Sequence, residues 1–220
     1  LPINAKNGIH FNKAAAEGIL GKVYLFMGRN SQALLQFSSA IADNAARTRP
    51  ARLYDYNAEF SMGGKFTPMN YNGPNNSPGL DLNDFTESLV SRSFYNSSYS
   101  GNGYGNDAFV LSPSAQSLFK DSDLRLNFYA PEFPYSTPNP SGRLRKYAFQ
   151  YTQFGLQLSD LYLLSAEAKA RINNFNGAKD DLEFLRRHRM PLNDATVPAV
   201  VAGEQKKLLT FIFEERIREF

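Results

Sequence analysis

The residues best suited to chemistry gather in one stretch of this sequence, from Tyr54 to Ser112. Six of the twelve tyrosines lie there, together with nine asparagines and seven glycines. A tyrosine has a large rigid ring with a polar end, and an asparagine has both a hydrogen-bond donor and an acceptor. Glycine, proline and asparagine favour turns, so these groups are carried on loops, where binding residues are common. The composition predicts a surface that stacks on apolar faces and hydrogen-bonds to polar groups.

Candidate binding residues follow from their position in this stretch. Four tyrosines lie in or beside the loops expected at 70–78 and 97–106, outside any helical stripe, and three asparagines are their neighbours. We predict that the ligand-binding residues are Tyr71, Asn72, Tyr95, Asn96, Tyr99, Asn102 and Tyr104. The alternative for any single tyrosine is that it packs its loop onto the rest of the protein.

Charged residues on the expected helices are interpreted as structural. Glu167 is expected to pair with a basic residue on a neighbouring helix, Arg216 or Arg218. The charges at 214–219 have the three- and four-residue spacing of pairs on a helix surface. We therefore predict no catalytic residue among them.

No metal or cofactor site is predicted. The chain has no cysteine, which excludes disulfides and thiolate ligands. His10 and His188 have no ligand-like spacing, and Asp121 and Asp123 lack the rest of a calcium loop. The glycines at 101–105 lack the lysine and the strand–helix context of a phosphate loop.

The overall charge excludes one class of partner and leaves the compartment open. Lysine and arginine total 24 against 21 aspartates and glutamates, a net charge of +3, which does not indicate nucleic-acid binding. The basic run at 186–189 is expected to be a solvated helix end. No apolar run approaches the ~20 residues that cross a bilayer. The chain begins with Leu1, so we expect a processed or trimmed segment.

Two helical stretches would position the loops. The first predicts helices over about 11–27 and 30–45, and its residues Leu20, Gly21, Tyr24, Gly28, Ala33, Phe37 and Ala40 have tetratricopeptide-repeat spacing. Its first helix is expected to bury Ala16, Ile19, Leu20, Val23, Tyr24 and Met27. The second stretch predicts helices over about 157–173, 175–189 and from 204 onward. Short strands are expected at Ser88–Tyr95, Ala108–Leu111 and Tyr147–Tyr151.

The C-terminal motifs resemble those of the SusD/RagB family. In that family a D-x-Y-L-x-x-A-E-A helix precedes an A-x-x-x-L-x-x-x-R helix and an E-R-x-x-E-L/F helix. Here the first motif reads from Asp160 to Ala168, the second is carried by Ala178, Leu182 and Arg186, and the third reads from Glu215 to Phe220. Ser112-Pro113-Ser114 and Asp123-Leu124-Arg125 resemble the family's P-S and D-x-R segment.

The resemblance implies a function and a location. Members of this family are cell-surface lipoproteins of Gram-negative bacteria that capture nutrients, usually oligosaccharides, and they are not enzymes. The implied partners are an oligosaccharide and a SusC-like TonB-dependent transporter in the outer membrane. The lipid anchor would lie outside this sequence. Because the family's lipidation cysteine and first helical pair are missing here, we expect a fragment without the N-terminal and extreme C-terminal parts.

Together these features predict an all-α fold, a tetratricopeptide-like scaffold of helical pairs with a long loop-rich insert that contains short β-strands. We expect a single domain over 1–220, with scaffold helices at about 11–45 and 157–220 and the insert at about 50–156. An alternative is a helical-repeat adaptor that binds a peptide or protein partner. A glycosidase is a third possibility, which would need two carboxylates at a sugar cleft. Asp81, Asp84 and Glu87 have no role that the sequence assigns.

Overall fold

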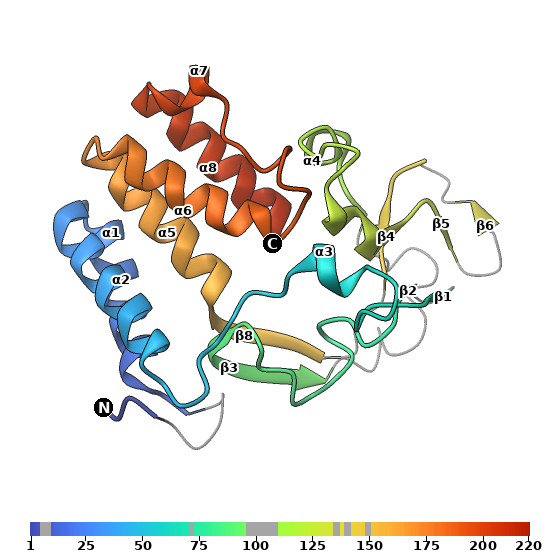
Figure 1. The fold of residues 1–220 in the computed structure, drawn as a ribbon, viewed down its shortest axis with the longest axis horizontal. Coiled ribbons are helices and arrows are strands. Elements are labelled where there is room, and N and C mark those ends of the chain that lie inside the picture. Colours follow the sequence, from blue (N-terminus) through green and yellow to red (C-terminus); the bar gives the residue numbers. More distant parts are fainter. Residues whose placement is uncertain (5–9, 71–72, 96–109, 134–136, 139–141, 148–150) are drawn as a thin grey trace.

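The computed structural model describes residues 1–4, 10–70, 73–95, 110–133, 137–138, 142–147 and 151–220. Five long helices form one stack, shown on the left and at the top of Figure 1. They are α1 (Lys13–Phe26), α2 (Asn30–Ala45), α5 (Leu158–Arg171), α6 (Phe175–Arg187) and α8 (Gln205–Glu219). Their bounds lie within a few residues of the predicted ones, and the predicted helical scaffold is confirmed.

The two helical pairs share one hydrophobic core although more than a hundred residues separate them in sequence. Helix α2 packs against α5, and α5 in turn packs against α6 and α8. Phe37 of α2 and Leu161 of α5 are both fully buried in that core. A pair of amphipathic helices cannot bury its apolar stripe alone, so stacking of neighbouring pairs supplies the core.

The buried face of α1 is only partly the predicted one: Tyr24 packs against the core as expected, but most of the other predicted residues do not. Helix α1 turns its smallest residues inward, namely Ala14, Ala15, Gly18 and Gly21, whereas Val23 is 48% exposed and Met27 is 55% exposed. The reason is close approach of neighbouring segments: a Cβ at Gly21 would lie 2.6 Å from the Phe37 ring. For most of these residues the apolar periodicity of the sequence therefore selected the wrong side of the helix, since glycine and alanine contribute little to it.

A two-stranded antiparallel ribbon connects the stack to the insert. Strand β3 (Ser88–Tyr95) pairs with β8 (Tyr151–Gln157), with an irregularity between Ser88 and Val90. The strand predicted at 88–95 is confirmed. Of the one predicted at 147–151, residue 151 begins β8, which ends at Gln157 directly before α5. Tyr147 is not in a strand, and 148–150 lie outside the described residues. Of the one predicted at 108–111, Val110 forms an isolated bridge with Arg145, and 108–109 also lie outside the description.

Short elements make up the rest of the described insert, on the right of Figure 1. They are α3 (Tyr56–Glu59), β1 (Met69–Asn70), β2 (Gly73–Pro74), α4 (Pro113–Gln116), η2 (Leu124–Phe128), β4 (Tyr129–Ala130), β5 (Glu132–Phe133), β6 (Thr137–Pro138) and β7 (Arg145–Lys146). A further short helix, α7 (Ala199–Ala202), precedes α8. A separate aromatic cluster of Tyr54, Tyr56, Phe60, Phe66 and Phe128 gives this region its own small core.

Candidate functional site

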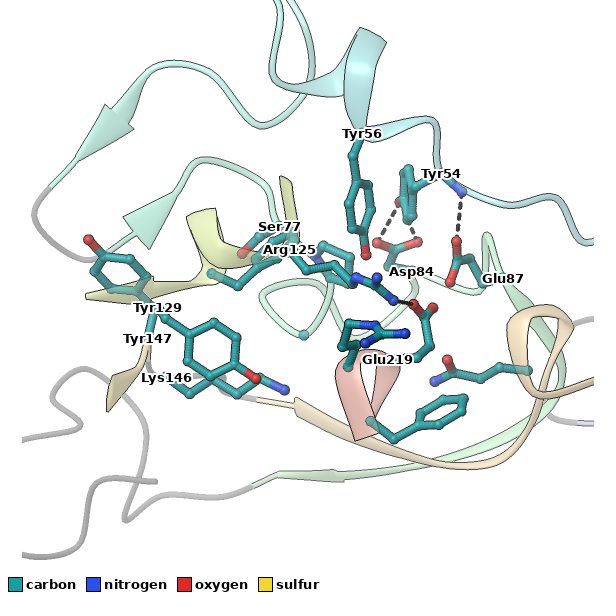
Figure 2. Close-up of a pocket in the computed structure, with 16 residues that line it drawn as sticks. Tyr54, Tyr56, Ser77, Asp84, Glu87, Arg125, Tyr129, Lys146, Tyr147 and Glu219 are labelled. Atoms are coloured by element: carbon teal, nitrogen blue, oxygen red, sulfur yellow. Dashed lines mark hydrogen bonds and ion pairs between the residues drawn. The ribbon is translucent and has the colours of Figure 1, made fainter. Parts of the chain in front are cut away.

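A cavity of about 380 Å³ lies where the insert meets the end of α8 (Figure 2). Aromatic rings form much of its wall, and they come from separate segments: Tyr54 and Tyr56 near α3, Phe128 at the end of η2, and Tyr129 and Tyr147 beside the β4–β7 pair. Such a wall can bury the apolar face of a ligand, and each tyrosine adds a polar end.

Polar groups also face this cavity. Ser77 and Gln157 line it, and so does Lys146, which extends along the ring of Tyr147 in Figure 2. Burial lowers the pKa of Lys146, against the opposing attraction of Glu219. Charged side chains complete the lining, namely Asp84, Glu87, Arg125, Arg218 and Glu219. A few polar groups placed among aromatic rings fix the orientation of a bound ligand.

Tyr56 holds its hydroxyl ready for a ligand. The centroid of its ring lies 4.4 Å from the guanidinium carbon of Arg189. The ring also packs edge-on against Phe128, with the two ring centroids 5.3 Å apart. Burial raises the pKa of Tyr56 far above its usual value, so the hydroxyl keeps its proton. No other described residue makes a hydrogen bond with this hydroxyl, which leaves it able to donate to and accept from a molecule in the cavity.

Tyr54 is held more tightly. Its hydroxyl donates to Asp84 at 2.7 Å, and Lys65 donates to the same hydroxyl and to Asp84. Burial alone would raise the pKa of Asp84, but these hydrogen bonds outweigh it and lower the pKa. Asp84 is therefore a carboxylate that orients Tyr54, which is a role the sequence alone did not assign.

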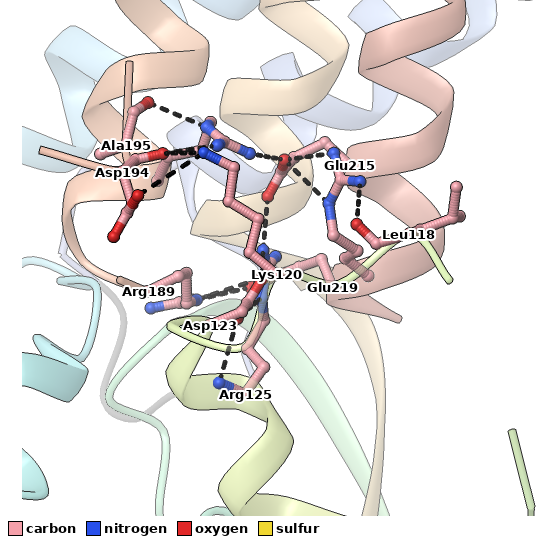
Figure 3. Close-up of polar contacts among 11 residues, drawn as sticks. Leu118, Lys120, Asp123, Arg125, Arg189, Asp194, Ala195, Glu215 and Glu219 are labelled. Atoms are coloured by element: carbon pink, nitrogen blue, oxygen red, sulfur yellow. Dashed lines mark hydrogen bonds and ion pairs between the residues drawn. The ribbon is translucent and has the colours of Figure 1, made fainter. Parts of the chain in front are cut away.

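A buried ion-pair network centred on Glu215 adjoins the cavity (Figure 3), and its members Arg125, Arg218 and Glu219 are part of the cavity wall. The Glu215 carboxylate is fully buried and accepts from Arg125 at 2.7 Å, from Arg186 at 2.6 Å and from Arg218 at 2.7 Å. Arg125 also forms a two-point pair with Asp123, through Nε at 2.9 Å and Nη2 at 2.7 Å. These contacts join η2, α6 and α8, so they fix the end of α8 against the insert.

A second centre of the same network is Arg189, which is completely buried. Its Nη2 donates to Glu219 at 2.7 Å and to Glu87 at 2.9 Å, and its Nη1 donates to the Tyr54 carbonyl oxygen at 2.8 Å. Glu87 in turn accepts from the Tyr54 backbone N–H at 2.7 Å. Arg189 and Glu87 thus hold the segment that carries the cavity's tyrosines.

The charges of this network compensate one another. Four arginines, at 125, 186, 189 and 218, face four carboxylates, at 87, 123, 215 and 219. Burial alone would raise the pKa of Glu215, but Arg125, Arg218 and Arg186 outweigh it and lower the pKa to about 2. At Glu87 burial prevails over Arg189, and the pKa is raised. The paired charges therefore act as a rigid support, because each arginine already has its carboxylate.

Two predictions about charged residues are wrong: that the charges at 214–219 form pairs on a helix surface, and that the basic run at 186–189 is a solvated helix end. The residues Glu215, Arg218 and Glu219 are buried network members and not a helix surface, and Arg186 and Arg189 of the basic run are buried with them. These positions lie on the side of α8 and α6 that faces η2, which spacing along one helix cannot reveal.

Glu167 also has a different partner from the one predicted. It pairs with Arg171 on its own helix at 2.7 Å. Arg216 pairs instead with Asp160 at 2.9 Å, and Arg218 pairs with Glu215. A partner one helical turn away satisfies Glu167 without a contact between helices.

The predicted binding residues lie almost wholly outside the described residues. This holds for Tyr71, Asn72, Asn96, Tyr99, Asn102 and Tyr104. The backbone of Tyr95 ends β3 opposite Tyr151, and its side chain lies outside the description. One link to the cavity is visible at Gly73, directly after Asn72. A Cβ there would lie 2.7 Å from the ring of Tyr147, a cavity residue.

Sequence reasoning missed the cavity residues Tyr129, Lys146 and Tyr147. They lie C-terminal to the asparagine-rich stretch, and no repeat or turn pattern singles them out. The structure places Tyr129 in β4, paired with Lys146, and Tyr147 directly after β7. Aromatic residues are enriched in strands, but these strands are only two residues long and too short to give a periodic signal.

Two absences hold for the described part of the chain. Its histidines, aspartates and glutamates nowhere gather in a group of three or more that could hold a metal ion. Among the helices that the structure describes, none is both long and apolar enough to pass through a bilayer.

No protein-family model matches the sequence, and no curated protein matches it. Solved structures do resemble it. One is described as a SusD-like carbohydrate-binding protein from Bacteroides vulgatus, with a TM-score of 0.67 and 17% identity over 98% of this chain and 44% of that one. Two are SusD superfamily proteins from Bacteroides thetaiotaomicron, with TM-scores of 0.68 and 0.63 and identities of 21% and 18%.

The alignment with these two covers 100% and 95% of this chain but only 50% and 46% of theirs, so the chain spans about half the length of the structures it matches. At identities near 20%, the similarity shows architecture. The chain therefore has the SusD-like fold.

Proposed function

We propose that this chain binds an oligosaccharide at the cavity between its insert and the end of α8. The observation that carries the proposal is the cavity wall of tyrosines and polar groups, set in a SusD-like fold. Tyrosine rings can stack on the C–H faces of a sugar, and the hydroxyl of Tyr56 and the amide of Gln157 can meet its hydroxyl groups.

The volume favours partial entry of the ligand. About 380 Å³ is at the small end of the range of roughly 300–1,000 Å³ for small-molecule sites. One end or one branch of an oligosaccharide would occupy the cavity, and the rest would lie across the insert. The loops with Tyr71, Asn72, Tyr95, Asn96, Tyr99, Asn102 and Tyr104 would then contact the remaining sugar units. Gly73, packed on Tyr147, ties one of these loops to the cavity.

The charge balance favours a neutral ligand. The arginines and glutamates of the cavity wall and of the network beside it pair with one another, and Lys65 pairs with Asp84 at 3.3 Å. Binding by stacking and neutral hydrogen bonds should depend weakly on salt, whereas exposed ionic attraction is screened over a length of ~10 Å at 0.1 M.

Binding without turnover is part of the proposal. Three carboxylates line the cavity. Asp84 orients Tyr54, and Glu87 and Glu219 both pair with Arg189. A glycosidase needs one carboxyl group as acid and another as base or nucleophile. Prolonged incubation of the chain with a bound oligosaccharide should leave the sugar intact, and release of a shorter product would contradict this point.

For the whole protein we propose a role in nutrient capture. It would sit at the outer cell surface through a lipid anchor outside this sequence and deliver the oligosaccharide to a SusC-like TonB-dependent transporter. The support is the fold and the family resemblance of the motifs. Fractionation of cells that express the full-length native protein tests it: recovery in the outer membrane is expected, and recovery from the cytoplasm alone would end the proposal.

The binding proposal is tested by a panel of neutral and acidic oligosaccharides immobilised on an array, followed by calorimetric titration of the best ligand. We expect a neutral oligosaccharide to bind and affinity to change little between low and high salt. Removal of one hydroxyl by Tyr56→Phe should weaken binding by about 0.5–1.5 kcal/mol. The matched control is Tyr162→Phe on α5, outside the cavity. Equal loss in both variants would argue against a role for Tyr56.

A further inference from the structure

A second recess lies in the helical stack and shares no lining residue with the cavity. It has a volume of about 500 Å³ and is lined by Leu25, Phe26, Gly28, Asn30, Leu164, Glu167, Arg171, Phe213 and Arg216. These residues come from α1 and the start of α2, from α5, and from α8. The recess is thus a groove with α5 as its floor and with α1 and α8 as its two sides.

Apolar side chains form the rims of the groove. Phe26 on α1 is 83% exposed, and Phe213 on α8 is 42% exposed. The apolar strip continues one turn further on each side, through Val23 on α1 and Ile217 on α8, both about half exposed. Residues three or four apart share one face of a helix, so each rim is a stripe and not an isolated side chain.

The groove also holds polar atoms without partners. The Nη1 atom of Arg216 and the Oδ1 atom of Asn30 are buried, and neither forms a hydrogen bond with any described residue. Arg216 uses its other terminal nitrogen to pair with Asp160 at 2.9 Å. Buried polar groups in folded proteins usually have partners, so a molecule bound in the groove can supply them after a small side-chain rotation.

Charge around the groove is uneven. Lys22 and Arg216 share one carboxylate, that of Asp160, at 3.2 and 2.9 Å. Arg171 pairs with Glu167 at 2.7 Å. Three cations therefore face two carboxylates, which leaves an excess positive charge shared by Lys22 and Arg216. Of these two, Arg216 lines the groove, one turn along α8 from Phe213. This arrangement favours an occupant with both apolar and acidic side chains.

We propose that this groove docks an amphipathic helix of a partner protein, with apolar side chains between Phe26 and Phe213 and a carboxylate directed at Arg216. A helix fits because the groove repeats the packing of the stack itself, one helix seated between two others. The rims also extend beyond the recess, over a length that a small molecule would leave uncovered but that a helix matches with apolar residues at three- and four-residue spacing.

Selection of peptides tests the proposal before the partner is identified. A library of random helical peptides of about 16 residues, roughly four turns, is displayed on phage and selected on the 220-residue chain. Counter-selection uses the double variant Phe26→Ser/Arg216→Gln. Enriched peptides are synthesised and titrated against the single variants, whose folding is checked by thermal melts. Phe26 is 83% exposed, so its replacement should leave folding intact.

We expect enriched peptides with an apolar face and an acidic residue, and binding about tenfold weaker or worse to Phe26→Ser and to Arg216→Gln. The matched control Leu35→Ser, at a 66% exposed position on α2 outside the groove, should bind as the parent does. The proposal is overturned if no peptide survives counter-selection, or if the selected peptides lack an acid and ignore Arg216→Gln. It is also overturned if sedimentation shows dimers that Phe26→Ser abolishes, because a second copy then fills the groove.

Discussion

Arg189 and Glu219 meet in the interior of the protein, with Nη2 of the arginine 2.7 Å from Oε1 of the glutamate. Arg189 follows α6 and Glu219 ends α8, and the same arginine reaches Glu87 and the Tyr54 carbonyl oxygen in the insert. One side chain thus joins the scaffold to the wall of the cavity. A cavity built on such a support keeps its shape before a ligand arrives, which reduces the entropic cost of binding.

Removal of one carboxylate from the centre of the network should lower the free energy of unfolding strongly. Glu215→Gln leaves three arginines facing a neutral group in the interior, and breaking a buried ion pair typically costs about 3–5 kcal/mol. Denaturant unfolding measures the loss. The matched control is Glu204→Gln, in an exposed pair with Lys207, which should cost less than about 1 kcal/mol. Equal effects of the two substitutions would show that the network does not stabilise the fold.

The network should also give the protein a dependence on acid. In the folded chain the pKa of Glu215 is about 2, below its ordinary value of 4.5. Because the folded pKa is the lower one, its stabilisation is complete above about pH 4.5 and is lost as the pH falls through about 2. The contribution is roughly 3 kcal/mol. Unfolding curves between pH 7 and pH 2 should therefore decline less steeply for Glu215→Gln, and an unchanged decline would exclude this residue as the cause.

A glycine in the ribbon offers a test of the link between stack and insert. Gly155 has φ of +153°, and a Cβ there would collide with the Val90 carbonyl oxygen of the paired strand. Gly155→Ala should cost about 2 kcal/mol or more. Gly142 has φ of +64°, but no atom lies near its Cβ position. Gly142→Ala therefore measures the backbone strain alone, and it should lower the free energy of unfolding by about 1 kcal/mol. If thermal melts rank the two variants equally, the ribbon does not need the close approach at Gly155.

The packing of the helical pairs predicts another contrast. Phe37 is fully buried between α1 and the core, so Phe37→Ala should cost about 3–5 kcal/mol. Leu35 is on the same helix but is 66% exposed. Leu35→Ala should lower the free energy of unfolding by less than about 1 kcal/mol. Denaturant unfolding of the two variants is the measurement. Similar small losses would mean that α2 is not part of the shared core.

Much of the scaffold could be predicted from the sequence, because several local signals agree there. Gly28 marks the end of α1, and Ala33 and Phe37 fall at repeat spacing along α2. The buried face of α1 was predicted wrongly for residues such as Val23 and Met27, because the face that carries Gly18 and Gly21 has little hydrophobicity. Local patterns specify where helices lie, but close packing of backbones depends on what lies opposite.

The candidate site was less accessible to sequence reasoning. Glu215 and Arg125 are ninety residues apart and meet only because η2 folds against α8. Their spacing along single helices suggested solvent exposure, and the buried partner could not be seen. The cavity likewise combines Tyr56 with Tyr147, which no local pattern connects. Sites formed by distant segments need the fold before their chemistry can be read.

The most direct test of oligosaccharide binding at the cavity is calorimetric titration of the ligand selected on the array into Tyr129→Ala and Tyr147→Ala. We predict that each variant stays folded and binds about 1–3 kcal/mol more weakly than the parent, because a stacking ring is lost. The matched control, Tyr24→Ala on α1, lies outside the cavity and should bind as the parent does once its melt confirms folding. Parent-like affinity in both cavity variants would contradict the assignment of the cavity as the sugar site.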